Sequence, residues 1–256
     1  MLTVGGSPII VSAASFLPTA IAPGQIITII GSGLGPPTPA GLQLTTAGLV
    51  DRLLSAELQL TTAGLVDTLL SETRVLFDGI PAPLLYVSST QISAIVPYGI
   101  AMGSSTRLQI EYQGIESSAL DLQVADSAPG IFTLDSSGTG PGAILNQDMT
   151  VNSSSNPADR NSVVTIYGTG EGQTNPGGID GLITGDTLRS PIQPVSVTIG
   201  GQPAEVLYAG AAPGLVAGVL QVKARIPAGV APGSAVPVIV TVGNRPSQPG
   251  VTLAVR

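Results

Sequence analysis

The chain has 256 residues and a net charge of −7 at pH 7, and only 10% of its residues are charged. It contains no Cys and no His, which excludes disulfides, thiolate nucleophiles and the commonest general base. Trp is absent, aromatic residues amount to 3%, and the charge balance is acidic, which argues against a nucleic-acid-binding protein. We therefore expect no enzymatic activity, no cofactor and no nucleic-acid partner.

No stretch of about 18 to 20 residues is apolar throughout, so the sequence predicts no membrane insertion. The first residues lack a basic region, and Pro8 and Pro18 interrupt the apolar stretch, which is unlike a signal peptide. An exported form would therefore need a leader upstream of Met1, or one already removed. A surface with so few charges gives little repulsion between copies, which favours self-association.

Residues 1–11 are interpreted as a separate N-terminal segment. They include several apolar side chains and precede the first strongly β-prone run. Such a segment is a candidate donor strand, able to add to the sheet of a neighbouring copy by β-augmentation. The side chains expected to make that contact are Leu2, Val4, Ile9, Ile10 and Val11.

Residues 12–126 are expected to form a first immunoglobulin-like β-sandwich. Short β-prone runs separated by Gly and Pro are typical of this architecture. Asp78-Gly79 lies between two apolar runs and predicts a tight hairpin turn. The expected strands are residues 25–30, 74–77, 84–87, 91–96, 107–112 and 119–124.

A tandem duplication lies inside this first module, at residues 42–71. Leu42 to Ser55 returns at Leu58 to Ser71 with one change, and the period is 58 − 42 = 16 residues. Part of the pattern has helical spacing, but we favour short β-hairpins that turn at Ala47-Gly48 and Ala63-Gly64. A tolerated duplication is the simpler interpretation, and a second surface for assembly is the alternative. The side chains expected on that surface are Leu49, Val50, Leu53, Leu65, Val66 and Leu69.

Residues 127–256 repeat the pattern of the first module and predict a second sandwich. Ile27 to Gly35 returns as Val164 to Gly172, and Val75 to Tyr86 returns as Val197 to Tyr208 with Gly, Pro, Ala and Tyr in register. Gly200-Gly201 predicts the hairpin that matches Asp78-Gly79. The expected strands are residues 162–167, 195–199, 204–208, 220–226, 236–242 and 250–255.

The glycine-rich runs that end at Gly35 and Gly172 resemble phosphate-binding loops only superficially. Such a loop must open a helix, and Pro-rich or Asn-Pro-Gly sequence follows here instead, so we interpret both runs as turns. Glu171, Asp180 and Asp186 are weak candidates for a calcium site. Their spacing matches no EF-hand loop, and a solvated loop is the preferred interpretation, with no metal expected.

Four motifs together resemble a known family. They begin at Ala14-Ser-Phe, at Val75-Leu-Phe-Asp-Gly-Ile-Pro-Ala-Pro, at Ala128-Pro-Gly-Ile-Phe and at Ile166-Tyr-Gly-Thr-Gly-Glu-Gly. The chain resembles the uncharacterised C-terminal domain abundant in Solibacter and other Acidobacteria, which is itself similar to immunoglobulin-like IPT/TIG modules. This resemblance implies tandem β-sandwiches at the end of a large exported protein, and no catalytic residues.

Two functional hypotheses follow. The first is a non-enzymatic structural protein, secreted or at the cell surface, whose copies self-associate into a filament or fibre. N-terminal strand exchange is the candidate route of that association. The second is an anchoring or adhesion module of a larger secreted protein that binds polysaccharide or another cell-surface partner. The few aromatic residues count against the second, because carbohydrate platforms usually present exposed rings.

Overall fold

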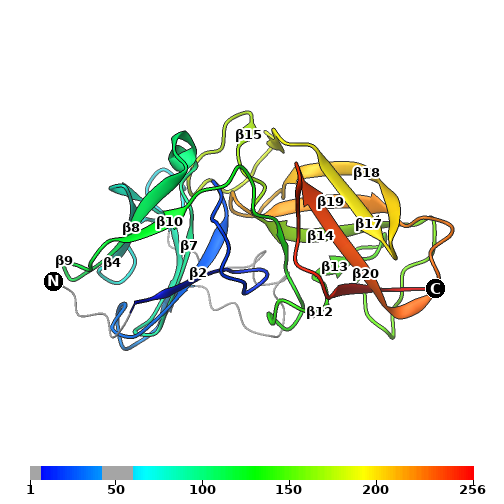
Figure 1. Cartoon of the computed structure of the whole chain (residues 1–256), viewed down its shortest axis with the longest axis horizontal. Helices are drawn as coiled ribbons and strands as arrows, with labels where there is room; N and C mark the ends of the chain where they lie inside the picture. The colour runs from blue at the N-terminus through cyan, green and yellow to red at the C-terminus, as the bar shows by residue number, and fades with distance from the viewer. Residues whose placement is uncertain (1–6, 42–59) are drawn as a thin grey trace.

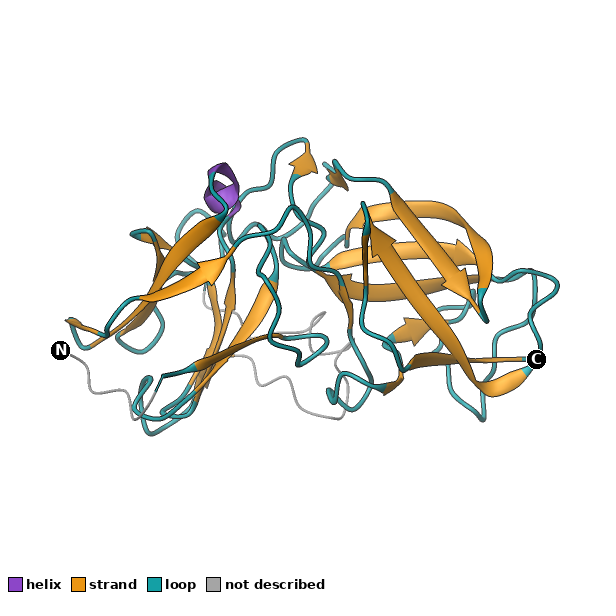
Figure 2. Ribbon diagram, viewed as in Figure 1, coloured by secondary structure: helices purple, strands orange, loops and turns teal. Residues whose placement is uncertain are grey.

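The computed structural model describes residues 7–41 and 60–256, except for the side chains of residues 101 and 102. In this part of the chain the regular elements are β-strands and one 3₁₀ turn, η1 (Tyr98–Met102), as Figure 2 shows. The strands form two modules that lie end to end (Figure 1). The all-β fold predicted from the sequence is confirmed.

Module one is a sandwich of two five-stranded sheets. One sheet has the order β1-β2-β7-β6-β3, and the other runs β10-β8-β4-β5 with β9 paired to β8. The strands are β1 (Ile9–Ser12), β2 (Ile26–Ile30), β3 (Ala40–Gly41), β4 (Thr73–Phe77), β5 (Ile80–Pro81), β6 (Leu84–Val87), β7 (Gln91–Ile95), β8 (Ser105–Tyr112), β9 (Ile115–Glu116) and β10 (Leu120–Gln123).

Module two is built around a continuous path of strands, β11-β14-β19-β18-β17-β20-β22-β12, with β13 paired to β14 and β21 to β20. A small separate hairpin joins β15 to β16. The strands are β11 (Gly130–Ile131), β12 (Gly140–Pro141), β13 (Ile144–Leu145), β14 (Val163–Thr169), β15 (Thr174–Asn175), β16 (Ser190–Pro191), β17 (Val195–Ile199), β18 (Gln202–Ala211), β19 (Leu220–Arg225), β20 (Gly233–Val242), β21 (Arg245–Pro246) and β22 (Val251–Val255).

The sheets of module two are joined by one strand that passes between the layers, whereas module one has two separate sheets. Strand β18 pairs with β17 at its start and with β19 at its end, so it passes from one layer to the other. The matching stretch of module one is divided into β5 and β6, and Pro83 lies in the gap, where module two has Glu205. Proline has no N–H to donate to a ladder, but the Pro83 carbonyl still accepts the Ile95 N–H at 3.0 Å, and the Ala82 N–H bonds the Val75 carbonyl at 2.9 Å.

The two predicted hairpins are confirmed. Asp78 and Gly79 join β4 to β5 with φ values of 49° and 82°, and Gly200 and Gly201 join β17 to β18 with φ values of 59° and 77°. Two successive residues with positive φ are the requirement of a type I′ turn, which matches the twist of the flanking strands. The repeated sequence therefore specifies the same turn in both modules.

Each module has its own apolar core, and a third cluster joins them. The core of module one includes Phe77 and Ile110, and that of module two includes Ile166 and Val238, all buried. The third cluster, here called the junction cluster, contains Ala13, Ala14, Ile26, Val66, Leu85 and Ile95 from module one and Phe132, Ala143, Leu145, Tyr167, Ala212, Leu215, Val216 and Val219 from module two. The modules therefore share buried surface, and Phe132 packs at the junction.

The N-terminal segment differs from its expected boundary. Ile9–Ser12 forms β1 and pairs antiparallel with β2 of its own chain, so the sheet of module one begins before residue 12. Leu2 and Val4 lie outside the described residues, as do Leu49, Val50, Leu53 and the turn expected at Ala47-Gly48. Within residues 7–41 and 60–256, no helix has the length and hydropathy needed to cross a membrane.

Candidate functional site

The calcium candidates lie near the junction between the modules, but the structure brings only two of them together. Tyr98, at the start of η1, donates its hydroxyl to Glu171 Oε1 at 3.3 Å and its backbone N–H to Asp180 Oδ1 at 2.9 Å. Asp186 is exposed on the loop that precedes β16. No group of three or more acidic residues in the described part of the chain could hold a metal ion.

Glu171 is a buried carboxyl at this junction. It is 2% exposed, and its Oε2 atom has no hydrogen-bond partner among the described residues. Burial raises the pKa of Glu171 to about 7, against smaller lowering effects of a backbone hydrogen bond and of the bond from Tyr98. Burial likewise raises the pKa of Asp180, which is only partly buried. The junction therefore contains an acid whose charge changes near neutral pH.

The glycine-rich loop explains why Glu171 is placed there. Gly170 has a φ of 86°, and a Cβ at this position would overlap the carbonyl oxygen of Ala128. The loop therefore lies directly on the segment that links the modules, and a backbone N–H of Ala128 bonds the Gly170 carbonyl at 2.9 Å. In the repeat of module one the position of Glu171 is taken by Leu34, which is fully buried in the core. Gly170 therefore serves the close packing of the loop against the linking segment.

Polar contacts reinforce the junction cluster. The Ile26 N–H donates to Thr169 Oγ1 at 2.8 Å, and Gln173 Nε2 donates to the Tyr98 carbonyl at 2.7 Å. Both bonds connect module one to module two. Buried backbone groups cost free energy when they lack partners, so these bonds help the two surfaces remain together.

The N-terminal assembly candidates divide by exposure. Ile10 and Val11 are 8% and 5% exposed and belong to their own sandwich, whereas Ile9 is 57% exposed opposite Ile30 at 41%. The outer edge of β1 is largely occupied, because the Ser12 N–H bonds the Leu17 carbonyl and the Ser12 carbonyl accepts the Phe16 N–H. By the alternation of antiparallel pairing, Ile10 alone within β1 has both backbone groups on the free edge.

The second copy of the duplication is used inside the molecule. The turn at Ala63-Gly64 is present, closed by a hydrogen bond from the Thr61 N–H to the Leu65 carbonyl at 2.7 Å. Val66 is 2% exposed in the junction cluster and donates its N–H to the Gly181 carbonyl at 2.8 Å. Leu65 is half-buried and Leu69 is 40% exposed. Val66 therefore has no surface to offer a second copy in this structure.

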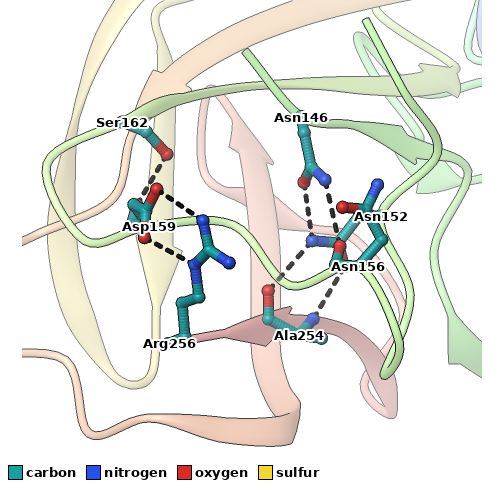
Figure 3. Close-up of polar contacts among 7 residues, drawn as sticks. All are labelled: Asn146, Asn152, Asn156, Asp159, Ser162, Ala254 and Arg256. Carbon is teal, nitrogen blue, oxygen red and sulfur yellow. Dashed lines mark hydrogen bonds and ion pairs between the residues drawn. The ribbon is translucent and has the colours of Figure 1, made fainter. Parts of the chain in front are cut away.

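A polar pocket lies in module two, beside the end of β22. Its frame is an asparagine network in the loop between β13 and β14, shown in Figure 3. Asn152 Nδ2 donates to Asn146 Oδ1 and to the Ala254 carbonyl, both at 2.9 Å, and Asn152 Oδ1 accepts the Ala254 N–H at 2.7 Å. Asn146 and Asn152 are 7% and 3% exposed. Every such bond ties the loop to a strand or to itself, so the wall of the pocket is held in place.

The rim of the pocket carries an ion pair and several polar groups. Arg256 Nε and Nη2 donate to the two carboxylate oxygens of Asp159 at 2.7 and 3.1 Å, and Ser162 donates to the Asp159 carbonyl at 2.6 Å (Figure 3). The Arg256 hydrogen bond lowers the pKa of Asp159. The cavity measures about 400 Å³ and is lined by Asn146, Gln147, Asp148, Asn156, Pro157, Ala158, Asp159, Ser162 and Arg256.

Sequence reasoning missed this pocket. The stretch from Asn146 to Asn161 is rich in Asn, Ser and Asp, a composition that indicates only a loop. What makes it a pocket is its contact with β22, about a hundred residues later in the chain. The only indication in the sequence is the recurrence of Asn at 146, 152 and 156, separated by few apolar residues.

Comparisons with known proteins give one family-model match, which lies over the first module. Solved structures include the Plexin A4 extracellular region, domains 1 to 10, at 13% identity and a TM-score of 0.28, covering 100% of this chain and 16% of that one. Another is the surface glycan-binding protein PbSGBP-B from Prevotella bryantii, at 13% identity and a TM-score of 0.25, covering 96% and 42%. These scores are too low to support an inference about function, and the search of curated proteins found no match. Residues 10–124, in contrast, match the family model of the IPT/TIG domain. Over module one the chain is thus similar to the immunoglobulin-like IPT/TIG domain that its sequence motifs indicated.

Proposed function

We propose that the chain is a non-enzymatic structural segment of an extracellular or cell-surface protein, and that copies of it associate into a filament by exchanging β1. The supporting observation is the position of β1, an edge strand that pairs with β2 over four residues and leaves Ile9 and Ile30 exposed at one end. The same pairing can form between two copies. A head-to-tail exchange whose rotation between copies does not close into a ring produces an open filament.

Exchange of β1 fits the geometry better than addition of a further strand beside it. Only Ile10 presents both backbone groups on the outer edge of β1, because Ser12 is occupied by the following turn. An added strand would therefore gain few hydrogen bonds. An exchanged β1 recovers all contacts of the closed form, including burial of Ile10 and Val11.

A cross-linking experiment tests the exchange, because the chain has no Cys of its own. The variants Ile9→Cys and Ile30→Cys place single thiols at paired, exposed positions whose separation in an antiparallel pair suits a disulfide. Mixed in equal amounts under assembly conditions, they are expected to form a disulfide between copies. The double variant should close internally and stop assembly. Both results are read by non-reducing electrophoresis and electron microscopy.

The control mixture pairs Ile30→Cys with Ile115→Cys, which is exposed but is not a strand partner of Ile30. It should cross-link far less. A wild-type chain that stays monomeric at all concentrations would overturn self-association. Filaments that form without the Ile9–Ile30 cross-link would overturn exchange of β1 and direct attention to another surface.

The second candidate function is an anchoring module that attaches a larger secreted protein to polysaccharide, and the polar pocket of module two favours it. The finer family resemblance, to the Solibacter-type C-terminal domain, also stays a prediction. Both candidates use the pair of modules as one unit, as the junction cluster supports.

A further inference from the structure

We infer that the polar pocket of module two binds a neutral, hydroxyl-rich ligand with the chemistry of a short oligosaccharide. This inference rests on the second candidate function and assigns it a place in the fold. A cavity of about 400 Å³ falls within the range of roughly 300 to 1,000 Å³ that small-molecule sites occupy.

The rim of the pocket offers both donors and acceptors. Gln147 Oε1 accepts the Val163 N–H at 3.1 Å, which leaves the Nε2 donor of this exposed side chain without a partner among the described residues. Arg256 uses Nε and Nη2 on Asp159, and its Nη1 has no such partner. Asp148 Oδ2 and Asn156 Oδ1 are acceptors that likewise have no partner among the described residues. Asp148 accepts from Thr150 through Oδ1, and Asn156 donates through Nδ2. A hydroxyl group is a donor and an acceptor at once and can satisfy such a mixed set.

Charge argues against other ligand classes. Asp148 and Asp159 would repel an anion, and the Arg256 charge is already paired with Asp159. A divalent cation would need more acidic ligands than the described residues gather at one place. Among the lining residues only Pro157 and Ala158 have apolar side chains, and Ala158 is 3% exposed, so an apolar ligand would contact few carbon side chains there. A neutral polyol fits what remains.

The wall of the pocket does not need to be ordered by the ligand. Asn146 and Asn152 are buried. Asn152 holds the loop to β22 through two hydrogen bonds with Ala254, at 2.9 and 2.7 Å, and bonds Asn146 within the loop at 2.9 Å. A site that is already formed loses less conformational entropy when it binds. This compensates in part for the absence of an aromatic platform among the lining residues.

The test is an NMR titration of the ¹⁵N-labelled 256-residue chain with maltohexaose, cellohexaose, xylohexaose and laminarihexaose, each in turn. At least one should shift the side-chain amide signals of Gln147 and Asn156 in a saturable way. Gln147→Glu keeps the acceptor for Val163 and removes the free donor, so it should weaken that binding about fivefold or more, as the loss of one hydrogen bond does. Gln123→Glu makes the same charge change on the exposed surface of module one and should leave binding unchanged.

Separate titrations with inorganic phosphate and with calcium chloride complete the experiment. Shifts of the same signals by phosphate or calcium alone, or no response to any of the four sugars, would overturn the inference. Sugar binding that Gln147→Glu leaves intact would overturn it as well. The state of association, followed in parallel by light scattering, reports on exchange of β1 independently, so failure of one proposal is not failure of the other.

Discussion

Replacement of Glu171 by Gln should remove a pH-dependent loss of stability. The folded-state pKa of Glu171 is raised from 4.5 to about 7, so the folded chain binds a proton more tightly than the unfolded chain. Its stabilising contribution is present below pH 4.5 and is lost as the pH rises to 7. This difference of 2.5 units corresponds to about 3 kcal/mol. Between pH 4 and 8, the free energy of unfolding of Glu171→Gln should therefore gain about 3 kcal/mol relative to wild type, as measured by urea denaturation.

The comparison between wild type and Glu171→Gln separates the effect of Glu171 on stability from the effects of the other acids. Asp180, whose pKa is also raised, and Asp78, whose pKa is lowered by bonds from Thr106 and Arg107, are present in both proteins and cancel. A constant offset from the new amide also cancels, because it does not vary with pH.

A second variant tests the cause of the shift. The Tyr98 hydroxyl lowers the pKa of Glu171, so Tyr98→Phe should move the pH-dependent loss of stability to higher pH. Arg189, whose charge lowers the pKa of Tyr98, is present in both variants. Parallel stability curves for Glu171→Gln and wild type would show that water reaches Glu171 in the folded chain.

Phe132→Ala should destabilise both modules together. Phe132 is 2% exposed in the junction cluster, and truncation of a buried phenylalanine costs about 3 to 5 kcal/mol. Because Ile26 and Ile95 of module one belong to the same cluster, hydrogen exchange should accelerate in β2 and β7 as well as in β14. The measurements are urea denaturation and hydrogen exchange followed by mass spectrometry.

Leu207→Ala is the matched control for this loss. Leu207 lies on β18 and is 46% exposed, so its truncation should change the free energy of unfolding by no more than about 0.5 kcal/mol. Faster exchange confined to module two in Phe132→Ala would contradict a shared junction, since Phe132 would then support its own module alone.

The sequence predicted what depends on local pattern. The hairpins at Asp78-Gly79 and Gly200-Gly201 were predictable because a type I′ turn demands positive φ at two successive residues, and the flanking runs have the length of strands. The register of the internal repeat, in turn, predicted two copies of one architecture. Turn dihedral angles and strand lengths depend on neighbouring residues in the sequence, so the sequence alone can predict them.

The junction and the pocket depend on contacts that no local pattern encodes. Glu171 looked like a solvated acid because its own loop is rich in Gly. In the structure it is 2% exposed and accepts a hydrogen bond from Tyr98, 73 residues earlier in the chain. Val66 looked available for assembly because Gly181, its partner, belongs to the other module. The asparagine network forms a pocket wall through its hydrogen bond to β22, which lies far from it in the sequence.

The junction cluster also constrains the order in which the protein can mature. Module one leaves the ribosome before module two. Its junction residues Ile26, Leu85 and Ile95 are therefore synthesised before the residues that cover them, Phe132, Leu215 and Val219. Until those residues emerge, an apolar surface of module one faces the solvent and is open to chaperones or to other nascent chains. The two modules therefore complete their folding together, because module two covers the apolar surface that module one leaves exposed.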